Sequence, residues 1–257
     1  MGQYNKRIKG DTKEKNARNG RTKSNIGTLI EKGAIFMKKI LTTLLLAALF
    51  VTPSAFAATQ DEALSTAQRL AGEGAVLRES ELDNGVYEFE FADEAANARI
   101  DVDIMADSGA PLKMDVNFRS VKKAKTAALD EAQAREAAQT LLGEAAVIDY
   151  ALPEQDDGRY EWKLFYTDGG NSGVLTLQAE TGEAQDRELY FDANALTAQQ
   201  AVQALESAKG AVQILELDLD LDDAQTLNYD GRARLDGAVY EFELRASDGQ
   251  IVEWERD

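Results

Sequence analysis

The sequence predicts an α+β protein in which three tandem repeats each pack one α-helix on a small antiparallel β-sheet. An alanine-rich helical pattern occurs three times, and each copy is followed by segments in which apolar and charged residues alternate. A period of 3.6 residues indicates an amphipathic helix, and a period of two indicates a strand with one buried face. Each copy also contains a glycine turn, 37, 39 and 39 residues after the glycine that ends its helix. Matches in the same order three times indicate an internal repeat.

The chain opens with a basic segment that we place outside the repeats. Residues 1–36 carry nine Lys and Arg against three acidic residues. We expect these residues to be a disordered extension upstream of the true start of the protein, which we place at Met37. The alternative is a basic arm that binds nucleic acid, which would be unusual in front of an export signal.

Residues 37–57 have the three parts of a secretory signal peptide. Lys38 and Lys39 precede an apolar run over residues 40–51, and a small-x-small motif follows at residues 55–57. The run is shorter than the ~20 apolar residues of a membrane-spanning helix. We expect cleavage after Ala57 and export to the periplasm or the medium, without a stable membrane anchor.

Each predicted helix begins at a capping box and ends at a glycine. In a capping box, a short polar N-cap and a Glu or Gln three residues later bond to the free amides of the first turn. The N-caps are Thr59, Asp130 and Thr197. A glycine stands 13 residues after each N-cap, where we expect a left-handed C-cap. These glycines are Gly72, Gly143 and Gly210.

Strand patterns follow each helix, with aromatic or leucine side chains on one side and charged ones on the other. We expect the apolar side to form a core with the helix. The apolar positions are Tyr87, Phe89, Phe91, Tyr160, Trp162, Leu164, Tyr240, Phe242 and Leu244. The recurring turn before the last strand places its glycine at Gly109, Gly182 and Gly249.

These signals place the repeats at residues 58–118, 129–191 and 196–257. The first linker carries four basic residues, which we interpret as a solubilising connector, with an anion site as the alternative. They are Arg119, Lys122, Lys123 and Lys125. Units of about 60 residues without disulfides are marginally stable alone. We therefore expect neighbouring repeats to pack on one another.

The third repeat resembles the PepSY domain. The resemblance is carried by the segments LELDLD at residues 215–220, YDG at 229–231, YEFEL at 240–244 and SDGQIVEWE at 247–255. Residues 179–183 match the family's A-x-T-G-x turn best, and the first repeat departs most because Pro111 follows its turn at once. The architecture is also similar to the tandem helix-and-sheet repeats of β-lactamase inhibitory proteins.

The resemblance covers residues 59–257 and rests on fold motifs rather than catalytic ones. It implies an exported bacterial α+β domain of the kind found in propeptides of thermolysin-like metallopeptidases and in envelope and spore proteins. It also implies inhibition or modulation of a peptidase, which we expect to act in trans because the sequence shows no peptidase domain.

The composition excludes several kinds of chemistry. The chain contains no Cys and no His, which excludes disulfides, Cys- or His-ligated zinc or haem, and Ser-His-Asp or Cys-His catalysis. Cleavage after Ala57 would leave 17 basic and 43 acidic residues, a net charge of −26. Such a charge opposes binding to nucleic acid and to anionic membranes.

An acidic ladder in the third repeat is the candidate metal site. Its weak candidate ligands are Asp218, Asp220, Asp222 and Asp223. The first three alternate with leucines, and Asp223 follows directly after Asp222. On a strand, alternate acids share one face roughly 6–7 Å apart, and calcium takes oxygen ligands. An EF-hand is not supported, because Asp223 and Tyr229 occupy the positions of its glycine and bidentate glutamate. The alternative is a solvated strand face over a leucine core, with no cofactor.

No residue pattern singles out a catalytic pair, so we expect a protein that is not an enzyme. The first hypothesis is an exported protein that binds other envelope or secreted proteins, with a peptidase as one candidate partner. Trp254 lies near the C-terminus on a predicted edge strand, which could pair with a peptide by β-augmentation. The alternative is an acidic structural or cation-buffering envelope protein, and an enzyme is the third hypothesis.

Overall fold

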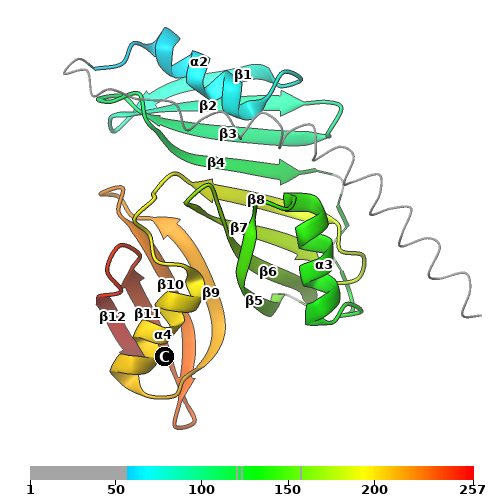
Figure 1. The fold of residues 1–257 in the computed structure, drawn as a ribbon, viewed down its shortest axis with the longest axis vertical. Helices are drawn as coiled ribbons and strands as arrows, with labels where there is room; N and C mark the ends of the chain where they lie inside the picture. The colour runs from blue at the N-terminus through cyan, green and yellow to red at the C-terminus, as the bar shows by residue number, and fades with distance from the viewer. Residues whose placement is uncertain (1–56, 120, 123, 157) are drawn as a thin grey trace, which may run out of the picture.

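The computed structural model describes residues 57–119, 121–122, 124–156 and 158–257. They form an α+β structure with two antiparallel sheets and three helices (Figure 1). The predicted extension and the signal peptide up to residue 56 lie outside the described residues, as does Lys123 of the first linker. Within the described residues, no helix is long and apolar enough to cross a membrane.

In chain order, each helix is followed by four strands. The first group is α2 (Gln60–Ala71), β1 (Val76–Asp83), β2 (Val86–Asp93), β3 (Ala98–Met105) and β4 (Pro111–Phe118). The second is α3 (Glu131–Leu142), β5 (Val147–Asp156), β6 (Arg159–Asp168), β7 (Asn171–Gln178) and β8 (Ala184–Tyr190). The third is α4 (Ala198–Lys209), β9 (Gln213–Leu221), β10 (Leu227–Leu235), β11 (Ala238–Arg245) and β12 (Ile251–Arg256).

The three helices begin as the capping boxes predict. Both reciprocal bonds are present at each N-cap, and at Asp130 the side chain accepts from the Gln133 amide at 2.9 Å. The glycines Gly72, Gly143 and Gly210 do end the helices, at φ values of 98°, 89° and 100°. The predicted left-handed conformation is wrong, however, because their ψ values of 167°, 175° and −174° are extended. That combination of positive φ and extended ψ is essentially restricted to glycine.

The sheet arrangement differs from three separate small sheets. β1 to β8 form one eight-stranded sheet in the order β1-β2-β3-β4-β8-β7-β6-β5, and β9 to β12 form a four-stranded sheet in the order β12-β11-β10-β9. The joint is an antiparallel pairing of β4 with β8, from Lys113 opposite Tyr190 to Asn117 opposite Asp186. Each of these strands ends a four-stranded meander and would otherwise leave its backbone groups unpaired at an edge.

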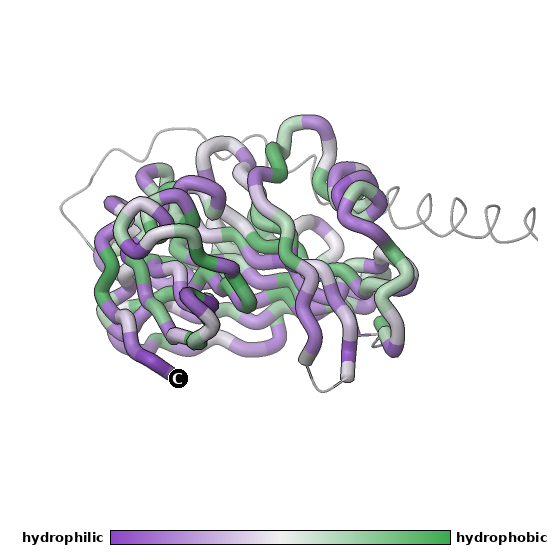
Figure 2. Tube along the Cα trace, turned by 90° about the horizontal axis from the view of Figure 1, so that it is seen from below, coloured by the Kyte–Doolittle hydropathy of each residue, from purple (hydrophilic) through white to green (hydrophobic). Residues whose placement is uncertain are grey.

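The apolar sides of the strands face the helices, as the alternation predicts, and Figure 2 shows hydrophobic and hydrophilic residues alternating along the strands. One core joins α2, α3 and the helix side of the eight-stranded sheet. A second core lies under α4 and extends to Leu152, Phe165, Val174 and Tyr190 of the eight-stranded sheet. Leu164 and Tyr166 belong to the first core and Phe165 to the second. The third helix-and-sheet group therefore packs on the face of the large sheet opposite α3.

Candidate functional site

The four predicted metal ligands lie at the β9 edge of the four-stranded sheet. Asp218 and Asp220 are on β9, and Asp222 and Asp223 follow it. The intervening Leu217 and Leu219 are buried, so the predicted alternation of outward acids and inward leucines is present. Asp218, Asp220 and Asp222 nevertheless interact with different partners.

Asp218 is bound by a lysine of the other sheet. The Lys163 ammonium on β6 donates to Asp218 and lies 3.0 Å from Oε2 of Glu154 on β5. Burial by itself lowers the pKa of Lys163. The hydrogen bonds and negative charges of Asp218 and Glu154 outweigh burial, so the pKa of Lys163 is raised overall. Burial raises the pKa of Glu154 to about 7 against the lowering effect of Lys163. This trio connects the two sheets.

The other candidate ligands are directed elsewhere. The Asp220 carboxylate lies 3.9 Å from the Lys113 ammonium on β4. Asp222 Oδ1 accepts from the backbone amides of Ala224 and Thr226, both at 2.8 Å, and these bonds lower the pKa of Asp222. Asp222 therefore closes its own loop.

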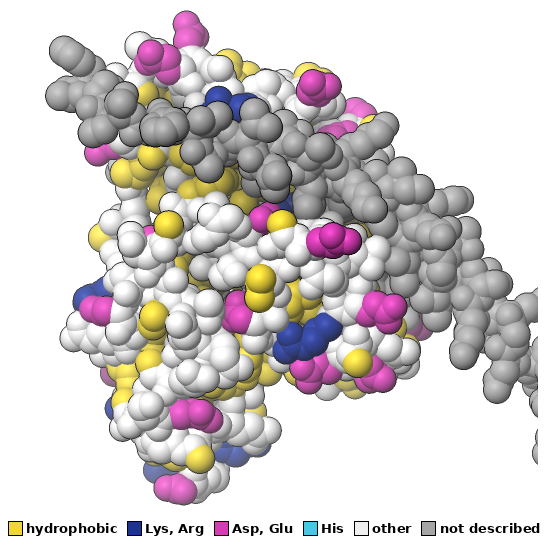
Figure 3. Space-filling view, in the orientation of Figure 1, with side chains coloured by type: hydrophobic (Ala, Val, Ile, Leu, Met, Phe, Trp, Pro, Cys, Tyr) yellow, Lys and Arg dark blue, Asp and Glu magenta, His cyan; other side chains and the backbone are white. Residues whose placement is uncertain are grey.

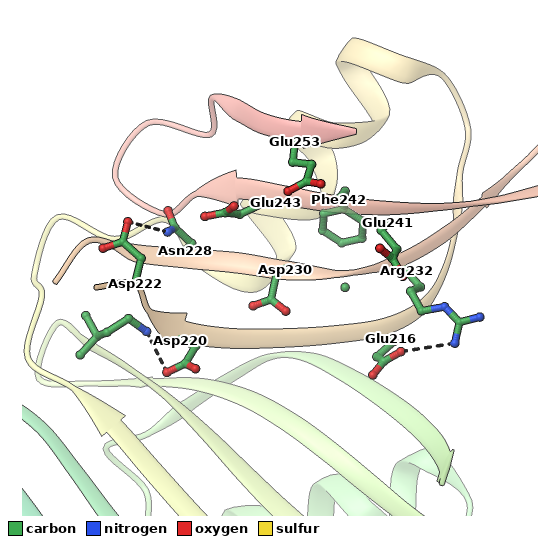
Figure 4. Close-up of a pocket in the computed structure, with 12 residues that line it drawn as sticks. Glu216, Asp220, Asp222, Asn228, Asp230, Arg232, Glu241, Phe242, Glu243 and Glu253 are labelled. Atoms are coloured by element: carbon green, nitrogen blue, oxygen red, sulfur yellow. Dashed lines mark hydrogen bonds and ion pairs between the residues drawn. The ribbon is translucent and has the colours of Figure 1, made fainter. Parts of the chain in front are cut away.

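A row of acidic residues crosses the outer face of the four-stranded sheet. The pairing register places one carboxylate from each strand side by side, and neighbouring strands lie about 4.8 Å apart. The row consists of Asp218, Asp230, Glu243 and Glu253. Beside it runs a second row of Glu216, Arg232, Glu241 and Glu255. Figure 4 shows members of both rows lining a shallow hollow.

Asp230 lies inside the first row and has the most perturbed carboxyl group on this face. Burial raises its pKa to about 6, and the charges of Asp218, Asp220 and Glu243 add to the effect. We missed this residue in the sequence. The alternating glutamates of the last two strands were visible, but only the pairing register shows that they meet Asp230.

A second acidic cluster lies at the joint between β4 and β8. One carboxylate oxygen each of Asp115, Asp186 and Glu188 lies within 4.8 Å of the other two. The pKa of Asp186 is raised to about 8. Burial is the largest cause, and the charge and hydrogen bond of Asp115 add to it. Asp115 Oδ1 is buried and has no hydrogen-bond partner in the described part of the chain. Lys113 lies 3.1 Å from Glu188. Residues of β4 and β8, from the first and second helix-and-sheet groups, form this cluster. No local sequence signal could bring them together.

The outer face of the first group of strands is acidic as well. A hollow there is lined by carboxylates of β1, β2 and β3 and by one arginine, Arg99, whose Nε lies 2.9 Å from Asp101 Oδ2 and 3.3 Å from Glu90 Oε2. Burial, followed by the charge of Glu88, raises the pKa of Asp103 to about 6. On the helix-bearing face, by contrast, Figure 3 shows Asp and Glu dispersed among neutral and apolar atoms.

The three comparisons with known proteins leave the family open. No family model matches the sequence, and no curated protein matches it. The solved structures similar to this chain include the YpeB C-terminal domain of Bacillus megaterium, at 17% identity and a TM-score of 0.28, covering 78% of this chain and 98% of that one. A "putative lipoprotein" of Clostridium difficile 630 has 16% identity and a TM-score of 0.29, over 55% of this chain and 99% of that one. A BLIP-like protein of Bacteroides fragilis has 14% identity and a TM-score of 0.22, over 53% and 88% of the two chains.

Proposed function

We propose that this chain is an exported, non-enzymatic protein of three tandem PepSY-like repeats, at residues 58–118, 129–191 and 196–257, which binds basic surfaces of envelope or secreted proteins. A peptidase is the partner class that the PepSY resemblance favours. The observation that carries the proposal is the set of carboxylate rows on the sheet faces that the helices leave open. Export follows from the signal-peptide pattern of residues 37–57.

The shape and charge of these faces favour a macromolecular partner. Carboxylates extend over β9 to β12 on one sheet and over β1 to β3 on the other, lining shallow hollows. Small-molecule sites are concave, mostly apolar clefts with a few convergent polar groups. An extended surface of one charge sign instead accelerates association with an oppositely charged protein and helps to select it.

A cross-linking pull-down tests the proposal. The bait is the full chain expressed with a C-terminal tag and purified after the producing cell has processed it. The prey is an envelope extract of that cell. A matched control bait removes charge from both acidic faces and keeps the side-chain size. It carries Asp230→Asn, Glu243→Gln and Glu253→Gln on the four-stranded sheet, and Glu79→Gln, Glu81→Gln and Glu88→Gln on the eight-stranded sheet. Enrichment of one protein by the wild-type bait over the control supports the proposal, and a captured peptidase is then assayed for inhibition. Equal recovery on both baits contradicts it.

The carboxylate row across the four-stranded sheet favours one alternative, a cation-buffering acidic protein. Carboxylate oxygens are ligands that calcium accepts at varied geometry. Isothermal titration with calcium chloride separates the two functions. Many weak sites that the control variant loses, together with an empty pull-down, would favour buffering.

A further inference from the structure

β1 is an edge strand with an open side. It lies at the end of the eight-stranded sheet and, among the strands that the structure describes, pairs with β2 alone. Its eight residues are all exposed except Leu77, which is half-buried. Helix α2 packs on β2, β3 and β4 and reaches β1 through a hydrogen bond that Gln60 Nε2 donates to Ser80 Oγ at 3.2 Å. An edge of this kind presents a row of backbone N–H and C=O groups that a further strand can use.

The turn after β1 shows which backbone groups are free. Asn84 and Gly85 have φ values of 45° and 83° and form a two-residue hairpin loop. The residues that flank such a loop form a hydrogen-bonded pair, and pairs of this kind alternate along the strands. Glu81 and Glu79 therefore bond to β2, whereas Ser80 and Leu82 direct their backbone groups toward the open side.

The two faces of β1 differ in chemistry. Leu82 lies opposite Tyr87 on the helix side of the sheet, and 57% of its surface is exposed. Glu79 and Glu81 lie on the other side, opposite Glu90 and Glu88, and line the acidic hollow. A strand added beside β1 would place alternate side chains next to Leu82 and next to these carboxylates. A strand in which apolar residues alternate with lysine or arginine would therefore match both faces of β1.

The corresponding strands of the other two groups already have a neighbour. β5 and β9 are the first strands of their groups, and they contact each other across the two sheets. β1 is the first strand of its group, and in the described part of the chain it packs closely on β2 only. A second copy of this chain fits the edge poorly. Antiparallel pairing of two β1 strands would bring Glu79, Glu81 and Asp83 of both copies onto one face, and like charges on neighbouring strands repel.

The other exposed edge, β12, is shorter than β1, with six residues against eight, and carries a cation beside its aromatic side chains. Trp254 stacks on Tyr240 at 4.7 Å between ring centroids, and the Lys209 ammonium lies 4.9 Å from the Trp254 ring. Glu253 and Glu255 are exposed on its outer face. β12 thus provides charges like those of β1, but Lys209 lies beside its aromatic side chains. Its exposed apolar residue, Val252, is 55% exposed and stands at the irregularity in the pairing of β12 with β11.

We propose that β1 is a docking edge for an extended segment of a partner protein in which basic and apolar residues alternate. The proposal rests on the proposed function, because it names where and through which chemistry a protein partner binds.

The test measures binding of a fluorescent peptide of alternating lysine and valine, equal in length to β1, by anisotropy. The protein is purified after the producing cell has processed it, as for the pull-down. A peptide of the same composition with its lysines in one block is the control probe. We expect saturable binding of the alternating peptide and weaker binding of the block peptide.

Two variants change the edge in different ways. Glu79→Lys with Glu81→Lys reverses the charges, and Ser80→Pro removes one outward N–H while β1 keeps its bonds to β2. Each should weaken binding about tenfold. The matched control, Glu136→Lys with Glu144→Lys, makes the same charge change at two exposed positions on and just after α3, outside the carboxylate rows. It should shift the affinity less than about threefold. Circular dichroism confirms that each variant is folded.

Several outcomes would overturn the docking edge. Equal binding of both peptides, or equal loss in the α3 control, would reduce the effect to charge attraction. Unchanged binding by Ser80→Pro would also overturn it. A wild-type dimer that Ser80→Pro dissociates would make a second copy the occupant and so refute the partner named above. In the pull-down, equal capture of a partner by Ser80→Pro would overturn the edge while the proposed function stands, whereas no capture by either bait would defeat the proposed function.

Discussion

Replacing Lys163 by methionine should weaken the contact between the two sheets. The Lys163 side chain is 14% exposed, and it bridges Glu154, 11% exposed, and Asp218, 40% exposed. Methionine has a similar length and no charge. The variant therefore keeps most of the packing and leaves two carboxylates without their shared cation.

The expected loss follows from the burial of the three groups. Breaking a fully buried ion pair costs about 3–5 kcal/mol. Here the cost is lower, because water screens the partly exposed Asp218, and because Glu154, whose pKa is about 7, can take up a proton. We expect a loss of about 2 kcal/mol near neutral pH. For a chain of this size, the melting temperature should fall by about 4–8 °C. The loss should shrink when the pH is lowered below the pKa of Glu154, since its protonation removes one of the two charges.

Urea and thermal unfolding of matched variants measure this effect. Adding Glu154→Gln to Lys163→Met should recover part of the stability, because one unpaired charge is gone. Arg245→Met is the control: Arg245 pairs with Asp248 at 3.1 Å, with 38% and 52% of the side chains exposed, and its loss should cost less than about 0.5 kcal/mol. If Lys163→Met costs no more than this control, or if the double variant recovers nothing, the ion trio does not stabilise the contact.

Three further predictions concern the eight-stranded sheet and helix α3, which packs on it. Gly173→Ala should cost about 2–3 kcal/mol in urea unfolding, because its Cβ would lie 2.4 Å from Cζ of Tyr166; a smaller loss would mean that this ring can move. The Asp186 carboxyl has a pKa of about 8 beside Asp115, so its ionisation opposes folding, and stability should fall as the pH rises from about 4 through 8. Asp186→Asn should flatten that dependence, and parallel curves for variant and wild type would contradict this assignment. Asp130→Ala removes an N-cap and should cost about 1 kcal/mol by thermal unfolding, and an unchanged melting temperature would show that the cap contributes nothing.

The local structure could be predicted because its causes lie within a few residues of one another. A capping box joins positions three apart, and the alternation of Tyr87, Phe89 and Phe91 sets the buried side of one strand by itself. Hairpin turns were available too and were missed. Asn84-Gly85 and Asp236-Gly237 have positive φ at both residues, as this kind of two-residue hairpin turn requires.

The sheet boundaries and the acidic clusters could not be predicted in the same way. A four-stranded meander with an apolar face is consistent with its own small sheet or with half of a larger one, since both bury the same side chains. Only the pairing of β4 with β8 decides between them, and it joins residues as far apart as Asp115 and Glu188. The placement of Asp230 next to Glu243 likewise depends on register, and a shift of one residue would have moved one of them to the other face.

Which strand edges are covered and which stay exposed connects the fold to the proposed function. Three helix-and-sheet groups built separately would leave two edges each. The chain joins β4 to β8, and it brings the edges of β5 and β9 into contact through an ion trio and a shared apolar core. β1 and β12 then remain as the exposed edges of the described structure, and both carry outward glutamates. Charged residues on an edge prevent pairing with other chains at random, and acidic ones oppose self-association while still admitting a basic strand. An edge that is long, open on its apolar side and acidic on the other is therefore selective rather than blocked. β1 has all three properties, whereas β12 is two residues shorter and has the Lys209 ammonium over its Trp254 ring.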